Sequence, residues 1–108
     1  MSNYAERLRR LATNDSRAIS DELGASPEPV SIDPRTLALV RLASLVAVGG
    51  SEPSFGEHTD AALDAGASTN EIVDVLIGIT PVVGLPRVVS AAPALARALG
   101  VDVESYMD

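Results

Sequence analysis

Two segments of this chain are apolar on nearly every side, and they constrain its fold more than any other feature. The first spans residues 37–48 and the second spans residues 72–83. Both have the length of a helix, and a helix that is apolar all round must be covered on most of its sides. A chain of 108 residues has few other elements to cover them. We therefore expect an all-α bundle that associates with further copies of itself; the alternative is a tight monomer with the N-terminal arm as a lid.

Residues 1–24 are predicted to form this N-terminal helical arm. Apolar residues recur there at helical spacing, and a break is expected at Asn14-Asp15. Residues 24–33 contain two prolines, which predicts a linker or an extended loop. At the other end of the chain, residues 101–108 form an acidic tail.

The main body, residues 33–100, carries start and stop signals for four helices. Asp33 is an N-cap acceptor followed by proline, and Ser68 with Glu71 matches a capping box. Glycines end the first, second and fourth helices, and Pro81 is expected to end the third. The predicted helices span residues 34–48, 52–65, 69–80 and 86–99.

Composition and charge exclude several functions. No cysteine is present, which excludes disulfides, thiolate metal sites and cysteine chemistry. Eight basic residues, all arginine, stand against 15 acidic ones, and the net charge of −7 disfavours nucleic acid as a partner. No apolar stretch without a charge reaches the ~20 residues that a bilayer requires. We expect a cytoplasmic protein with neither a nucleic-acid nor a membrane partner.

His58 is the only histidine and the first candidate for chemistry. Phe55, Ala62 and Ala65 lie at positions i−3, i+4 and i+7 from it, so it follows the apolar stripe of its predicted helix. Histidine suits proton transfer near neutral pH, but this pattern by itself favours a core histidine bound to backbone and hydroxyl groups. One histidine without cysteine cannot build a transition-metal site alone, so no metal ion is expected.

Arg41 is the second candidate, because it interrupts an otherwise apolar helix. A buried guanidinium needs either an anionic partner in the protein or an anionic ligand, and its planar fork suits a carboxylate. A structural ion pair between helices is the more common explanation. Its candidate partners are Glu52, Glu57 and Asp74. Arg35 and Arg87 lie near helix starts, where solvation is the simpler interpretation.

Small polar residues near the start of the second predicted helix are weaker candidates for chemistry. Ser51 and Ser54 fit N-capping, and no serine has the G-x-S-x-G setting of a hydrolase nucleophile. Gly49-Gly50 is too short for a phosphate-binding loop, because neither a lysine nor a second set of glycines follows it. We therefore expect no cofactor.

An ordered set of motifs runs through residues 33–99. It consists of Asp33-Pro34-Arg35-Thr36, His58 with Ala61-Ala62-Leu63 and Ala65-Gly66, Thr69-x-Glu71-Ile72, and Gly84-Leu85-Pro86. This set resembles the carboxymuconolactone decarboxylase family, which is similar in fold to the alkylhydroperoxidase D proteins. The resemblance implies an alkylhydroperoxidase D-like helical bundle over residues 33–100. It also implies a trimer or hexamer with active sites near the subunit contacts.

The chain departs from this family pattern at two places. The peroxidase-like branch uses C-x-x-C-x-x-x-H, and Ser51 and Ser54 stand at the two cysteine positions that precede His58. A hydroxyl cannot perform thiol–disulfide exchange, so the chain is not expected to be a cysteine peroxidase. The family also places a glutamate upstream of the histidine, and the corresponding residue here is Ala38 or Leu39. The decarboxylase branch lacks the cysteines and keeps the histidine, so this chain looks closer to it.

The resemblance implies a lyase that acts on a small carboxylated lactone or ring acid, as in the catabolism of aromatic compounds. Loss of CO2 leaves a dienolate that must be stabilised and then protonated at carbon. His58 is the candidate catalytic proton donor. The candidate binding residues for the anionic substrate are Arg41, Arg35, Arg87, Ser51 and Ser54. The alternatives are a non-catalytic oligomeric small-molecule-binding protein of the same fold and a partner-binding helical module.

Overall fold

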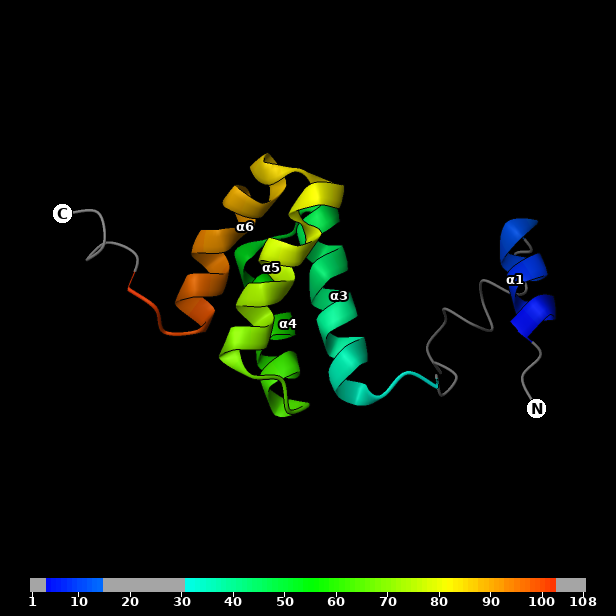
Figure 1. Cartoon of the computed structure of the whole chain (residues 1–108), viewed down its shortest axis with the longest axis horizontal. Helices are drawn as coiled ribbons and strands as arrows, with labels where there is room; N and C mark the ends of the chain where they lie inside the picture. Colours follow the sequence, from blue (N-terminus) through cyan, green and yellow to red (C-terminus); the bar gives the residue numbers. More distant parts are fainter. Residues whose placement is uncertain (1–3, 15–30, 103–108) are drawn as a thin grey trace. The chain divides into compact units, whose positions relative to one another are not determined.

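The computed structural model describes residues 4–14 and 31–102, and every regular element among them is a helix (Figure 1). The chain divides into two compact units, residues 1–31 and residues 32–108. Helix α1 belongs to the first unit, and helices α3 to α6 belong to the second. The all-α class predicted from the sequence is confirmed for the described residues.

Helix α1 spans Tyr4–Ala12 and buries none of its residues. Thr13 continues the turn, and Asn14 has a φ of 55°, in the left-handed region that ends a helix. The predicted break at Asn14 is therefore confirmed. The remainder of the predicted arm, residues 15–24, lies outside the described residues.

The second unit contains four helices close to those predicted. Their bounds are Pro34–Val48 for α3, Glu52–Asp64 for α4, Thr69–Val83 for α5 and Leu85–Ala98 for α6. All four begin within one residue of the prediction, and three also end within one residue of it, because caps and glycines are local signals. Pro93 lies inside α6; the sequence predicts a kink of the helix at this proline, and that kink stays a prediction.

The predicted end of the third helix before Pro81 is wrong. Helix α5 continues through Pro81 to Val83, and the backbone N–H of Gly84 then donates to the carbonyl of Thr80. Pro81 removes only the hydrogen bond to the carbonyl of Ile77. Ile77 is 65% exposed, so water can replace the missing donor there. A proline in the last turn is therefore tolerated.

The four helices of the second unit pack in a closed ring. Helix α4 packs mainly on α3 and α6, and α5 packs on the same two helices from the other side. Each helix contributes to one core between them, as Figure 1 indicates for the arrangement of α3 to α6. The fully buried side chains of largest volume are Leu42, Ile72, Leu95, Val46 and Thr59.

Two acidic residues anchor helix starts in this ring. The Asp33 carboxylate accepts from the backbone N–H of Thr36 at 2.9 Å, and from its hydroxyl at 2.7 Å. Glu71 accepts from the backbone N–H of Ser68 at 2.9 Å, and Ser68 Oγ accepts in return from the N–H of Glu71. The N–H of Thr36 lowers the pKa of Asp33, and the N–H of Ser68 with the Arg35 charge lowers the pKa of Glu71.

These caps predict a loss of stability in acid. Because both pKa values are lower in the folded chain, the stabilisation is present above the unfolded pKa, near pH 4, and is lost as the pH falls through the folded values. We expect the unfolding free energy of the Asp33→Asn, Glu71→Gln double variant to change less between pH 5 and pH 3 than that of the wild type. Asparagine and glutamine keep the capping acceptors. Denaturant titrations at pH 5 and pH 3 measure the unfolding free energy of the wild type and of the variant. An equal change between the two pH values for both chains would contradict the prediction.

Candidate functional site

His58 lies on α4, beside the core but not inside it. Its ring is half-buried, whereas Phe55 is 5% exposed and Ala62 is fully buried. The following residue, Thr59, takes the central position on this face of the helix and is fully buried. Within the described part of the chain, His58 forms no hydrogen bond or ion pair. The hydrogen-bonded core histidine that the pattern favoured therefore finds no support here.

The side of α4 that carries His58 faces α3. Glu52 accepts a hydrogen bond from Arg97 of α6, so the side of α4 that carries Glu52 faces α6. At about 100° per residue, His58 lies roughly 120° round the helix from Glu52. The buried side chains of Phe55 and Thr59 lie between these two directions. Because α3 is the other main neighbour of α4, His58 lies at the α3–α4 contact.

Arg41 is exposed on α3, so the expectation that its guanidinium is buried is wrong. The buried side chains of this helix are Leu42 and Val46, and among the described residues only the face that carries them is covered. Val40 is 47% and Val48 is 72% exposed on the remaining surface. Arg41 pairs with none of the predicted partners, and it makes no ion pair with any residue in 4–14 or 31–102.

Helical spacing also shows which side of α3 carries Arg41. The side chain of Leu45 lies against Gly50, in the turn that leads into α4; a Cβ added to Gly50 would be 2.6 Å from Cδ1 of Leu45. Ala38 and Arg41 precede Leu45 by seven and four residues and therefore share its side of the helix. Of the two positions considered for the family glutamate, Ala38 is thus the one near α4.

The other two candidate arginines, Arg35 of α3 and Arg87 of α6, hold their guanidinium groups at opposite ends of α3. Arg35 donates through Nη1 to Glu71 Oε2 at 2.8 Å, at the first turn of α3. Arg87 donates through Nη1 to the carbonyl of Val48 at 3.4 Å, at the last turn. The thirteen residues from Arg35 to Val48 correspond to about 20 Å of helix. A single chain therefore does not gather Arg35 and Arg87 around one small ligand.

Ser51 and Ser54 follow the same line of α4 as His58. Ser51 is the N-cap, and its Oγ accepts from the backbone N–H of Ser54 at 3.3 Å. The Ser51 hydroxyl also donates to Ser54 Oγ at 3.0 Å. The N-capping interpretation is confirmed, and the two hydroxyls form a polar end to the α3–α4 contact next to His58.

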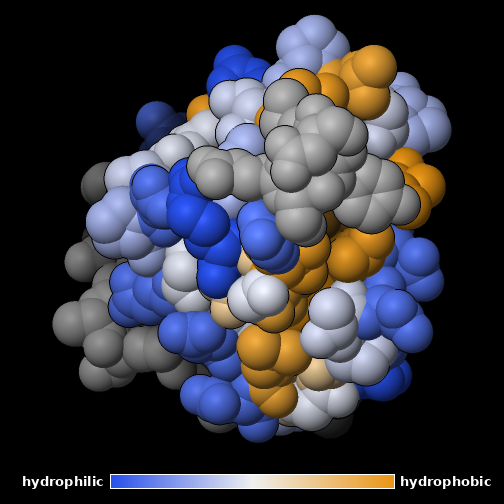
Figure 2. Space-filling view, turned by 90° about the vertical axis from the view of Figure 1, so that its left-hand side faces the viewer, coloured by the Kyte–Doolittle hydropathy of each residue, from blue (hydrophilic) through white to orange (hydrophobic). Residues whose placement is uncertain are grey.

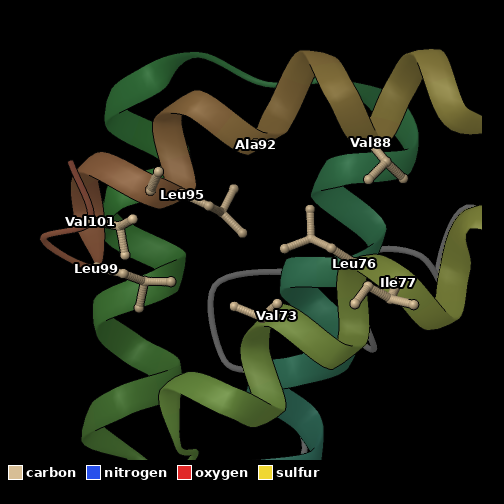
Figure 3. Close-up of a pocket in the computed structure, with 9 residues that line it drawn as sticks. Val73, Leu76, Ile77, Val88, Ala92, Leu95, Leu99 and Val101 are labelled. Carbon is tan, nitrogen blue, oxygen red and sulfur yellow. The ribbon is translucent and has the colours of Figure 1, made fainter. Parts of the chain in front are cut away.

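Sequence reasoning missed two features of this unit. The first is the Glu52–Arg97 ion pair, which joins residues 45 positions apart and leaves no local signal. The second is an apolar groove between α5 and α6 with a volume of about 220 Å³ (Figure 3). Its lining side chains come from α5, from α6 and from Leu99 and Val101, which follow α6. The helical spacing of apolar residues on α6 was the signal for the groove.

Two further kinds of site are absent from the described ranges 4–14 and 31–102. No three His, Cys, Asp or Glu side chains there are grouped so that they could hold a metal ion. No helix in these ranges combines the length and the apolar content needed to cross a bilayer. The His58–Arg41 region is accordingly the candidate functional site.

Comparison with known proteins tests the resemblance. No curated protein and no solved structure matches the chain. The model of the carboxymuconolactone decarboxylase family matches residues 17–97, which is three quarters of the sequence. The match includes all the motifs at 33–86 and extends upstream of them. The chain therefore belongs to the carboxymuconolactone decarboxylase family.

Proposed function

We propose that the chain is a lyase that removes CO2 from a small carboxylated lactone or ring acid at the α3–α4 contact. In this proposal His58 is the proton donor and Arg41 binds a substrate carboxylate. Family membership supports the reaction class, because the name of the family refers to a decarboxylase. The roles of His58 and Arg41 are supported by the fact that neither side chain has a partner among the described residues.

One observation supports the proposal: an imidazole and a guanidinium, neither with a partner among the described residues, belong to the two helices that flank one short turn. Gly50 lies in the short turn between α3 and α4, and these two helices run in opposite directions (Figure 1). Arg41 is nine residues before Gly50, and His58 is eight residues after it. Residues equally far from such a turn lie at similar levels along the two helices, which supports a common site for Arg41 and His58.

The two side chains have complementary tasks in this reaction. The bond between the ring carbon and the departing carboxylate breaks, CO2 leaves, and the electron pair passes into the conjugated carbonyl as a dienolate. Arg41 binds a remaining carboxylate through two parallel hydrogen bonds and stabilises the negative charge. The protonated imidazole of His58 then gives its proton to carbon and recovers one from water.

A local cation is necessary because the chain as a whole repels the substrate. Its net charge is −7, so an anion gains no long-range attraction from it. Arg41 is the only arginine of α3 and α6 without a partner among the described residues, because Arg35, Arg87 and Arg97 each donate to another group. The free guanidinium therefore lies where the proposed substrate needs it.

A non-catalytic small-molecule-binding protein is the second candidate, and Ala38 favours it. The family resemblance places a glutamate at Ala38 or Leu39, of which Ala38 is on the α4 side of α3, and neither side chain can exchange protons. His58 and Arg41 would then bind an anionic ligand without turning it over. Release of CO2 separates the two candidates.

Arg41→Met tests the binding role. We expect the KM for a carboxylated unsaturated lactone to rise about 10- to 100-fold, because losing a charge-assisted hydrogen-bonded contact costs roughly 1.5–3 kcal/mol. Stability should change by less than about 0.5 kcal/mol, because the side chain is exposed and has no described partner. CO2 release and loss of ultraviolet absorbance measure the reaction.

Arg97→Met is the matched control for this test. It removes the same charge from an exposed side chain on α6, away from the α3–α4 contact. The KM of this control should equal that of the wild type. If both variants raise the KM equally, Arg41 acts only through the overall charge and its proposed role is wrong. A wild-type chain that binds the lactone without releasing CO2 would establish the second candidate.

A further inference from the structure

We propose that the apolar groove between α5 and α6 binds a segment of the chain itself, residues 103–108. This segment 103–108 follows Asp102 and lies outside the described residues, and its sequence is Val-Glu-Ser-Tyr-Met-Asp. The proposal does not depend on the proposed decarboxylation, because it uses none of the residues at the α3–α4 contact.

The groove is a concave site that favours apolar side chains. Its most buried lining residues are Leu76 and Leu95, at 8% and 2% exposure, whereas Val73 and Ile77 are 41% and 65% exposed (Figure 3). Figure 2 shows apolar residues gathered on the side of the second unit that carries α6, with hydrophilic residues to either side of them. Because almost no polar group lines the groove, an occupant gains by burying apolar surface there.

The end of α6 leads the chain to this groove. The backbone N–H of Val101 donates to the carbonyl of Ala96 at 2.8 Å. The N–H of Gly100 donates to the carbonyl of Arg97 at 3.1 Å, and Gly100 has a φ of 75°. These features form a Schellman motif, which turns the chain back toward the last turn of the helix. Val101 consequently lines the groove, and the segment 103–108 starts two residues after it.

The order of residues in the segment suits a groove with apolar walls. In an extended chain, successive side chains point to opposite sides. One side then carries only apolar or small residues, which are Val101, Val103, Ser105 and Met107. The other side carries three acids and a tyrosine, which are Asp102, Glu104, Tyr106 and Asp108. The first side can enter the groove while the carboxylates of the second stay in water.

The segment also has the length and the bulk that the groove requires. The lining residues of α6 and its cap run from Val88 to Leu99, which corresponds to about 16 Å of helix. The six residues of the segment 103–108 reach about 20 Å when extended. A cavity of about 150 Å³ holds one benzene-sized group. The groove, at about 220 Å³, therefore has room for the side chains of Val103 and Met107.

The covalent connection favours this segment over a free molecule. A segment joined to the edge of the groove by a short linker has an effective concentration in the millimolar range. It also loses no translational freedom when it binds, which a free apolar molecule or a second copy does. The chain's own segment is therefore the occupant that the position of Val101 favours.

Disulfide formation in the full chain tests the proposal, because the chain has no cysteine of its own. Ala92 lines the groove about 10 Å along α6 from Leu99. Ser105 is four residues beyond Val101, or about 13 Å of extended chain. We expect the Ser105→Cys, Ala92→Cys double variant to form a disulfide within one chain at least about tenfold faster than a control variant does.

The matched control is the Ser105→Cys, Ser90→Cys double variant. Ser90 is exposed on α6, two residues before Ala92, and does not line the groove. Equal rates of disulfide formation in the two variants would overturn the proposal. A disulfide that forms faster with Ala92→Cys but joins two chains would also overturn it, because the occupant would then be the segment of a second copy.

Single cysteines provide a second test that needs no cross-link. We expect maleimide to label Val103→Cys at least about tenfold more slowly than Glu104→Cys, because only the first points into the groove. Dilution should not change the difference. Adding Ala92→Glu should remove it, because this change places a carboxylate in the groove against an acidic segment, whereas adding Ser90→Glu should preserve it.

Three results of the labelling experiment would overturn the proposal. Equal rates for Val103→Cys and Glu104→Cys would leave the groove to a free apolar molecule. A difference that survives Ala92→Glu, in a variant with an unchanged circular dichroism spectrum, would mean that the segment binds elsewhere. A difference that disappears on dilution would identify a second copy as the occupant.

Discussion

Replacing His58 with glutamine is expected to reduce the release of CO2 from a carboxylated lactone by at least about a hundredfold, the usual contribution of a positioned general acid. Glutamine keeps a hydrogen-bonding side chain of similar size but cannot deliver a proton near neutral pH. The ring is half-buried and has no partner among the described residues, so its loss breaks no described interaction of the fold. The expected effect is on kcat, with the circular dichroism spectrum unchanged.

Asp60→Asn serves as the control for this substitution. Asp60 is an exposed residue of the same helix, two positions after His58, and the change is likewise nearly isosteric. Its activity should match that of the wild type. Full turnover by the His58→Gln variant would rule out proton donation by this residue.

The helices were predictable because their boundaries depend on local chemistry. Asp33 and Ser68 each bind a backbone N–H within three residues, and such caps are visible in the sequence. Pro81 shows the limit of local rules. Whether a helix can pass through a proline depends on what replaces the lost hydrogen bond, and here that depends on the exposure of Ile77.

Which side of each apolar helix is covered could not be read from the sequence. The segments 37–48 and 72–83 are apolar nearly all round, so periodicity assigns no preferred inner face. The structure buries Leu42 and leaves Val48 72% exposed, because only one side of α3 meets its neighbours. The same ambiguity led to the expectation that Arg41 is buried.

The candidate site was predictable in its residues but not in its geometry. His58 and Arg41 stand out in the sequence as the single histidine and as a cation in an apolar helix. That Arg35 and Arg87 bind groups at opposite ends of α3 depends on partners 36 and 39 residues away. Such long-range pairing leaves no periodic signal, so a cluster of arginines could be neither assigned nor excluded in advance.

Leu42→Ala is expected to destabilise the second unit by about 2–5 kcal/mol, the usual cost of removing a buried leucine side chain. Leu42 is fully buried and belongs to the core shared by the four helices. Small domains are stable by only about 5–15 kcal/mol, so the loss is a large part of the total. The melting temperature should fall by roughly 10 °C or more. Thermal scans of both chains at one fixed concentration measure it.

Val40→Ala is the matched control, because Val40 lies on the same helix and is 47% exposed. It should lose less than about 1 kcal/mol. Equal losses at the two positions would mean that the core is not centred on Leu42. The comparison with Arg41→Met is sharper still, because Arg41 and Leu42 are consecutive residues on different sides of α3. Arg41→Met should lose substrate binding and keep its stability, whereas Leu42→Ala should lose stability first.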